Sequence, residues 1–368
     1  MKKKTVAVFL GGPSVEHEIS LVSSKSIIKN IDTTKFNILP IYITKKGKWH
    51  FINLISFLND DDHFYSSETQ VIPELTLTPS GKLLEIKEDK ILNRFETDVA
   101  FPILHGTYGE DGSIQGCFEL MGIPYVGADV LGSSIGMDKV VMNEILRDNK
   151  LPVVDFFGFT KSEWESKKNE IINRIKAEID YPCFVKSADL GSSVGISKVD
   201  SEELIYNAIE SSLKYSNKVL VEQAVINPRE VEVSVLGNEN PVASLPGEII
   251  PKKDFYDYEA KYHDDSTELK IPAELSPLMI DELKDLAVKT FTSLCCSGMG
   301  RIDFLINSNN EDIFVSEINT IPGFTSISMY PKLWEVSGIP YRELLTKLID
   351  LAEEKFNSKK TVKTDLMG

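Results

Sequence analysis

Residues 300–319 have the sequence GRIDFLINSNNEDIFVSEIN, which predicts two strands joined by a polar turn. Side chains two positions apart lie on one face of a strand, so Arg301 shares a face with Asp303. In the second strand, Glu317 shares a face with Asn319. Oxygen donors of this kind suit Mg²⁺, which keeps several waters and bridges nucleotide phosphates. The alternative is a solvated strand face with cross-strand ion pairs.

The two strands are expected to pair as an antiparallel hairpin that carries the metal site. For Asp303 and Glu317 to face each other on one surface, the connecting loop must contain an odd number of residues, or the pair must contain a bulge. Carboxylates on opposite faces would contradict the magnesium site.

A glycine- and serine-rich loop, GSSVG at residues 191–195, lies between predicted strands at 183–186 and 195–199. Glycine lets the backbone approach phosphate oxygens, and backbone N–H groups and serine hydroxyls can donate to them. Lys139 and Lys186 would supply compensating positive charge. The P-loop pattern GxxxxGK[ST] does not occur in the chain, and an ordinary hairpin turn is the alternative.

Two polar loops follow predicted strands near the start of the chain, GGPSVEHE at 11–18 and HGTYGEDG at 105–112. Ligands of open α/β sheets bind outside the carboxyl ends of the strands, which makes Glu16 and His105 candidate contacts. Glu16 could instead be a favourable charge in the first turn of a helix, and His105 a hydrogen-bonded core histidine. The double glycine is not GxGxxG, so a dinucleotide-binding oxidoreductase is disfavoured.

Alternating strands and helices predict an α/β fold whose first domain has a parallel sheet with helices on its faces. The first domain is expected to have strands at 5–10, 36–43 and 99–104, and a helix whose apolar stripe is Val15, Ile19, Val22, Ser26 and Ile27. Residues 53–96 are acidic and are expected to be an excursion with a short hairpin near 75–86. The expected domains are 1–127, 128–220 and 221–368.

The net charge of −16, from 40 basic and 56 acidic residues, argues against a nucleic acid or an anionic membrane as partner. A hydrophobic content of 42% is enough for substantial cores. The four cysteines form no C-x-x-C pair, which favours free thiols in a reducing cytoplasm. The apolar run that follows the basic start of the chain is too short for a signal peptide, and we expect no membrane span.

Taken together, the motifs resemble the D-alanine–D-alanine ligases of the ATP-grasp superfamily from about Val6 to Leu351. The ordered blocks are GGPSVEHE (11–18), LHGTYGEDG (104–112), MDK (137–139), GSSVG (191–195), FYDYEAKY (255–262), GMGRID (298–303) and EINTIPGFT (317–325). The resemblance implies a three-domain ATP-grasp architecture, in which an N-terminal parallel-sheet domain and two α+β domains enclose the nucleotide. One departure is Ser187, which stands where the family usually has proline.

The resemblance also implies roles for individual residues. The residues that it implies bind the nucleotide are Lys139, Lys186, Ser193, Glu222, Gln223, Val225, Glu230 and Lys261. Those that it implies bind the metal are Asp303, Glu317 and Asn319. The first D-alanine would meet Glu16 at its ammonium and His105 near its carboxylate, and Ser328 would hold the second carboxylate. Arg301 and the Gly323 N–H would stabilise the oxyanion, while Ser192 and Tyr262 would join Glu16 in a hydrogen-bonded latch.

The implied cofactors are ATP and magnesium, with two ions for which Mn²⁺ can substitute, and the implied assembly is a homodimer. Three rivals stay open. A D-lactate or D-serine ligase is the nearest, although Tyr262 favours the alanine type because lactate-type relatives lack it. The others are a different ATP-grasp carboxylate–amine ligase and a non-catalytic nucleotide-binding module, which would be expected to have lost Arg301 or a metal ligand.

Overall fold

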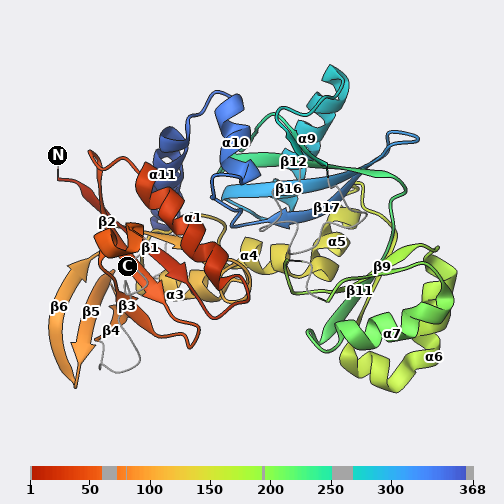
Figure 1. The fold of residues 1–368 in the computed structure, drawn as a ribbon, viewed down its shortest axis with the longest axis horizontal. Helices are drawn as coiled ribbons and strands as arrows, with labels where there is room; N and C mark the ends of the chain where they lie inside the picture. The colour runs from red at the N-terminus through yellow and green to blue at the C-terminus, as the bar shows by residue number, and fades with distance from the viewer. Residues whose placement is uncertain (1, 60–72, 80, 193–194, 251–267, 362–368) are drawn as a thin grey trace.

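The computed structural model describes residues 2–59, 73–79, 81–192, 195–250 and 268–361. These residues form four sheets (Figure 1). No helix among them is long and apolar enough to cross a membrane.

The first sheet has the strand order β3-β2-β1-β7 and is parallel except at one edge. Its strands are β1 (Lys4–Gly11), β2 (Phe36–Ile43), β7 (Val99–Ile103) and the antiparallel edge strand β3 (Trp49–Phe51). Helix α1 (His17–Asn30) connects β1 to β2, and α3 (Ser113–Met121) follows β7. The predicted parallel sheet is confirmed, and both polar loops lie at the carboxyl ends of its strands.

The predicted apolar stripe of α1 is wrong in part. Val15, which precedes the helix, is 64% exposed, and Val22 is 52% exposed. The buried face includes Ser20 and Ser23, whose hydroxyls bond to neighbouring backbone and side-chain groups. Small hydroxyl side chains can line a buried face when each finds a hydrogen-bond partner, so hydrophobicity alone misassigned it.

The excursion after β3 forms a sheet of its own. The predicted hairpin is confirmed as β4 (Glu74–Thr78) and β5 (Lys82–Lys87), and a third antiparallel strand, β6 (Lys90–Glu96), extends it. A short helix, α2 (Leu54–Leu58), precedes this sheet.

The central unit is an antiparallel sheet of order β10-β9-β11-β8 with helices on both faces. Its elements are α4 (Val130–Met137), α5 (Lys139–Asp148), β8 (Phe156–Thr160), α6 (Lys161–Glu178), β9 (Cys183–Ser187), β10 (Ser197–Val199), α7 (Glu202–Ser212) and β11 (Lys218–Gln223). Alternation along β8 explains the two layers, because Phe157 packs with α6 and α7 whereas Phe156 packs with Val140 of α5.

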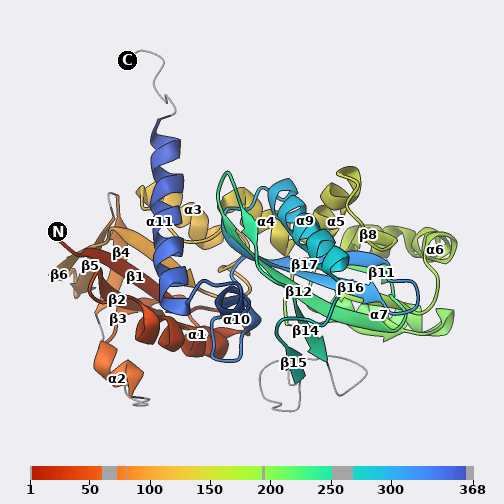
Figure 2. The same ribbon diagram turned by 90° about the horizontal axis from the view of Figure 1, so that it is seen from above.

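The third sheet carries the segment 300–319. Its strands are β12 (Pro228–Gly237), β13 (Val242–Ala243), β14 (Gly247–Ile250), β15 (Glu268–Lys270), β16 (Gly298–Asn307) and β17 (Ile313–Asn319). Helix α9 (Pro277–Ser293) covers one face, where Leu283 and Phe291 share a core with Ile302 and Ile318 (Figure 2). The opposite, polar face of β16 and β17 is left for the site.

The chain then returns to the first sheet. Helices α10 (Met329–Val336) and α11 (Tyr341–Lys360) pack against it, and Leu344 and Leu348 share one core with Val6 and Phe101. This return ties the first sheet to the third and fixes how the two meet at the site.

Candidate active site

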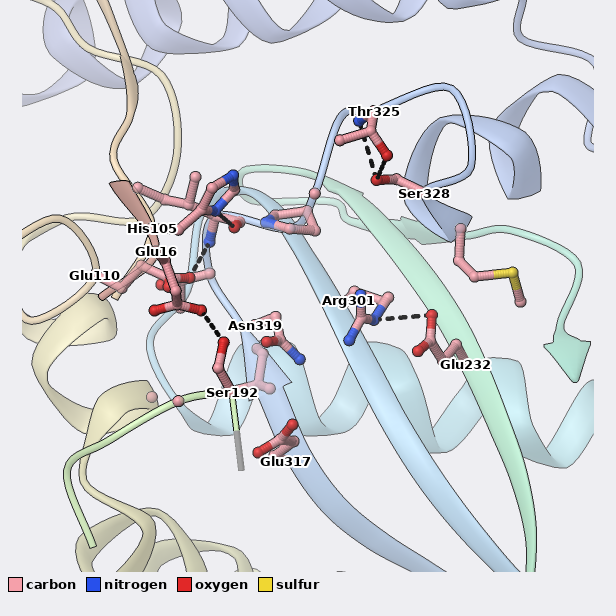
Figure 3. A pocket seen from close by; sticks show the side chains of 18 of the residues that line it. Glu16, His105, Glu110, Ser192, Glu232, Arg301, Glu317, Asn319, Thr325 and Ser328 are labelled. Atoms are coloured by element: carbon pink, nitrogen blue, oxygen red, sulfur yellow. Dashed lines mark hydrogen bonds and ion pairs between the residues drawn. The ribbon is translucent and has the colours of Figure 1, made fainter. Parts of the chain in front are cut away.

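Two cavities, of about 420 and 190 Å³, meet between the first, central and third sheets. The residues that line both are Lys139, Gly191, Ser192, Glu232, Ile249 and Glu317. Figure 3 shows the larger cavity, into which side chains from all three regions project. A ligand in one cavity can therefore touch a ligand in the other.

The strand pair forms the floor between the cavities. Strands β16 and β17 are antiparallel, with Asp303 opposite Glu317 and Arg301 opposite Asn319. The register shifts after Asp303, because Phe304 pairs with Val315 and Ser316 is the additional residue. The predicted antiparallel hairpin is confirmed, with Asp303 opposite Glu317, and of the two alternatives left open for its connection the pair does contain a bulge.

The donor set on this floor fits a hard cation. Asp303 and Glu317 supply carboxylates, and Asn319 supplies an amide that its Nδ2 bond to Asp303 Oδ2 (3.1 Å) holds in place. Within the described ranges no three His, Cys, Asp or Glu side chains cluster as a closed metal site. Two carboxylates and an amide leave coordination positions for phosphate oxygens and water, as Mg²⁺ prefers.

Arg301 is held rigidly beside these ligands. Its guanidinium donates from Nε and Nη2 to the two carboxylate oxygens of Asp303, both at 2.7 Å, and lies 3.0 Å from Glu232 Oε2. Burial opposes the charge, but Asp303, Glu232 and Glu317 outweigh it and raise the pKa of Arg301 further. The site therefore holds a permanent cation with fixed donors.

Two lysines approach the same region from the central unit. The buried Lys139, at the start of α5, donates to the Leu190 carbonyl at 2.8 Å and lies 3.8 Å from Glu317. Lys186 of β9 pairs with Glu222 at 2.5 Å. Burial would lower the pKa of Lys186, but Glu222 and other carboxylates reverse this and raise it. The Lys186 ammonium group therefore stays charged at neutral pH.

The smaller cavity has the lining expected of a nucleotide slot. Of the predicted nucleotide contacts, Lys139, Lys186, Glu222, Gln223, Val225 and Glu230 line it. The Gln223 side chain is already engaged, since it accepts from the Asp180 N–H (2.7 Å) and donates to the Pro182 carbonyl (3.1 Å). Gln223 therefore shapes the turn that ends the slot.

Glu16 lies in the larger cavity and accepts a hydrogen bond from the Ser192 hydroxyl (Figure 3). Ser192 has φ +53°, a left-handed conformation that is uncommon for serine. Gly106 passes so close that an added Cβ would lie 2.1 Å from Glu16 Oε2, and its φ is +73°. Only glycine fits beside the carboxylate at this point.

His105 is buried with both ring nitrogens engaged by protein. Nδ1 lies 3.1 Å from the Ile321 carbonyl, and Nε2 lies 3.1 Å from the Ser23 hydroxyl. A carbonyl can only accept, so Nδ1 carries the proton and Ser23 donates to Nε2. Burial lowers the pKa of His105, although Glu16 opposes the effect, and the ring is neutral at pH 7.

Two further predicted residues, Ser328 and Gly323, line the larger cavity. Ser328 is the residue directly before α10, and its hydroxyl accepts from the Thr325 N–H at 3.0 Å and makes no capping bond to the helix. Gly323 lies beside it, close enough that an added Cβ would be 2.7 Å from Ser328 Oγ. Ser193, Lys261 and Tyr262 lie outside the described residues.

Two charged residues that line the larger cavity, Glu232 and Glu110, were missed by the sequence reasoning. Glu232 lies two residues after Glu230 on β12, so the two share a face, and Glu232 pairs with Asp303 of β16. The two-residue spacing that predicted the polar face of Asp303 would have found Glu232 too. Glu110 belongs to the GEDG end of the 105–112 loop, and its carboxylate accepts the N–H groups of Gly106 (2.7 Å) and Ile321 (3.0 Å). Loss of hydration and the nearby Glu16 raise the pKa of Glu110 to about 8.

Comparison with known proteins agrees with this arrangement. The family described as "D-ala D-ala ligase N-terminus" matches residues 5–128, and "D-ala D-ala ligase C-terminus" matches residues 145–350. The chain belongs to the D-alanine–D-alanine ligase family. The family expected from the motifs is confirmed, and with it the reading of the chain as an enzyme.

Relatives resemble the chain over its whole length. A protein of Caldicellulosiruptor bescii named "D-alanine--D-alanine ligase" is 48% identical over 100% of both chains, and one of Natranaerobius thermophilus with the same name is 46% identical over 99% of both. The solved ligase of Coxiella burnetii has a TM-score of 0.85 at 36% identity and covers 98% of this chain and 97% of its own. VanG D-Ala:D-Ser ligase of Enterococcus faecalis has a TM-score of 0.84 at 34% identity, with 95% and 100% covered. The expected ATP-grasp fold is confirmed.

Proposed function

We propose that the chain joins two D-alanine molecules into D-alanyl-D-alanine with ATP, through a D-alanyl phosphate, in the synthesis of peptidoglycan precursors. The observation that carries this proposal is the hairpin floor, which puts Asp303, Glu317 and Arg301 between two adjoining cavities. One cavity suits a nucleotide and the other suits small zwitterions. Family membership supports the same reaction.

The first step is phosphoryl transfer to the carboxylate of the first D-alanine. A carboxylate oxygen bonds to the γ-phosphorus as ADP leaves, which turns a poor electrophile into an acyl phosphate. Lys139 and Lys186, together with Lys261 and Ser193, hold phosphate oxygens, while Glu222, Gln223, Val225 and Glu230 line the adenosine slot. Such transfer depends mainly on positioning and on neutralising charge.

Asp303, Glu317 and Asn319 would hold magnesium, as two ions for which Mn²⁺ can substitute. When bound, the metal neutralises the phosphates and orients the γ-phosphoryl group. The donors of the hairpin fit this cation in type and number.

The second step is attack of the second amine on the acyl carbon. The C–N bond forms, phosphate leaves with the C–O bond electrons, and the proton that the amine loses goes to the departing phosphate. Arg301 and the Gly323 N–H hold the oxyanion that develops, and such a donor contributes about 3 kcal/mol. Glu16 pairs with the first ammonium, His105 lies near the first carboxylate, and Ser328 holds the second carboxylate.

Water must be excluded while the acyl phosphate exists. The bond between Ser192 and Glu16 joins the glycine-rich loop to the first domain. Tyr262 would complete this latch from its own loop. We propose the domain division 1–127, 128–220 and 221–368, a homodimeric assembly and a cytoplasmic location.

D-alanyl-D-serine synthesis is the second candidate, because the D-Ala:D-Ser ligase matches the fold almost as well. Incubation with ATP, Mg²⁺ and D-alanine, alone or with D-serine or D-lactate, tests both. Phosphate and product are measured together, and L-alanine is the control. The proposal predicts D-alanyl-D-alanine as the main product, and preferential D-alanyl-D-serine would favour the second candidate.

A further inference from the structure

The backbone of Ile321 is held by one loop of the first domain at the peptide group before its Cα and at the peptide group after it. Its N–H donates to Glu110 Oε1 at 3.0 Å, and its carbonyl accepts from His105 Nδ1 at 3.1 Å. Glu110 and His105 both lie between β7 and α3, 211 and 216 positions away along the chain. One bond therefore holds the peptide group between Thr320 and Ile321, and the other holds the peptide group between Ile321 and Pro322. Neither peptide group can rotate or slide without breaking a hydrogen bond.

The groups that hold Ile321 are themselves fixed. The second oxygen of Glu110 accepts the Gly106 N–H at 2.7 Å, and the Ser23 hydroxyl holds His105 Nε2 at 3.1 Å. The Ile321 side chain is buried in the core shared by the first sheet and α11. Burial and the nearby Glu16 raise the pKa of Glu110 to about 8. The carboxyl group therefore loses hydration energy by lying at this place.

Ile321 occupies a sensitive place in the chain. It lies two residues after Asn319, which ends β17, and two residues before Gly323. The two clamped peptide groups therefore set where the Gly323 N–H, in the next peptide group of the chain, lies relative to Glu16 of the first domain. In the proposed reaction these two groups hold opposite ends of the same D-alanyl unit.

We propose that Glu110 is a positioning residue, which acts with His105 on the two peptide groups that flank the Ile321 Cα to align the Gly323 N–H with the substrate held by Glu16. This inference rests on the proposed ligation of D-alanine. It gives His105 a role through the backbone, because both of its nitrogens are engaged by protein groups. A displacement of about 1 Å at a reacting centre can reduce the rate by about a hundredfold.

The test compares Glu110→Ala with Glu110→Gln, and Glu96→Gln on the exposed strand β6 is the matched control. For each purified enzyme the turnover number, the KM for ATP, and the phosphate released per dipeptide are measured. Glu110→Ala is expected to lower turnover by about ten- to a hundredfold and to raise phosphate per dipeptide, since a misaligned acyl phosphate hydrolyses before the amine attacks. The KM for ATP should stay within about threefold, because Glu110 lines the larger cavity and not the smaller one.

Glu110→Gln keeps an oxygen that can accept the Ile321 N–H, so it should recover most of the lost turnover. Ser23→Ala, which removes the donor to His105, should change the phosphate ratio in the same direction, and it tests the clamp if the alanine variant at position 110 does not fold. Unchanged turnover and ratio in Glu110→Ala, or a glutamine variant no better than alanine, would overturn the inference. A wild-type enzyme that makes no dipeptide from D-alanine would instead contradict the proposed function, so the two failures are distinct.

Discussion

Glu317 lines both cavities and lies 3.8 Å from Lys139. Replacing it with glutamine removes one charge from the proposed magnesium site with little change in volume. We expect Glu317→Gln to lose nearly all turnover at ordinary magnesium concentrations while its circular dichroism spectrum and melting temperature stay close to wild type. Glu311→Gln, on the exposed turn of the same hairpin, is the control and should be fully active. Near-normal activity of Glu317→Gln would refute the metal role.

Glu110 also predicts a pH dependence of stability. Its folded pKa is raised from the ordinary 4.5 to about 8, so the folded protein retains a proton there that the unfolded chain has lost. The contribution of Glu110 to the free energy of unfolding is therefore complete below about pH 4.5 and falls as the pH rises towards 8. The glutamine of Glu110→Gln does not titrate. The melting temperature of this variant, measured relative to that of wild type, should therefore rise between pH 5 and pH 8. A difference that stays constant across this range would contradict the raised pKa.

At the scale of elements, the sequence predicted best where a pattern was local. The two-residue alternation of 300–319 predicted the hairpin and its polar face, but it left open whether the pair contains a bulge. The pattern failed for α1, because buried Ser20 and Ser23 obtain their partners from β1, β7 and the 105–112 loop. Glu110 was missed for the same reason, since its partner Ile321 is 211 positions away.

The proposed latch over the site joins two loops, the glycine-rich loop with Ser192 and the loop with Tyr262, to Glu16. Ser192→Ala deletes the bond to Glu16, and Tyr262→Phe would delete the proposed third member of the latch while keeping its ring. A lost hydrogen bond to a charged group costs about 1–3 kcal/mol. Each change should therefore slow dipeptide formation by about ten- to a hundredfold and raise phosphate per dipeptide, with little change in ATP affinity. An unchanged rate with a one-to-one ratio of phosphate to dipeptide would end the latch hypothesis.

At the scale of the whole molecule, helix α11 helps to hold the regions around the site in one arrangement. Lys355 of α11 donates to the Gly127 carbonyl at 2.5 Å and lies 4.2 Å from the centre of the Tyr125 ring. Lys359 pairs with Glu119 of α3 at 2.5 Å. These contacts fall where the first domain ends and the central unit begins. These contacts could not be predicted from the sequence, because long helices carry many lysines and only the fold shows which are buried.

The central claim is that this geometry couples ATP cleavage to the joining of two D-alanine molecules. The most direct measurement is the ratio of D-alanyl-D-alanine to phosphate in the wild-type enzyme supplied with ATP, Mg²⁺ and D-alanine, with L-alanine in a parallel reaction. We predict one dipeptide per phosphate with D-alanine and neither product above background with L-alanine. Phosphate release without dipeptide, or equal use of both enantiomers, would contradict the claim.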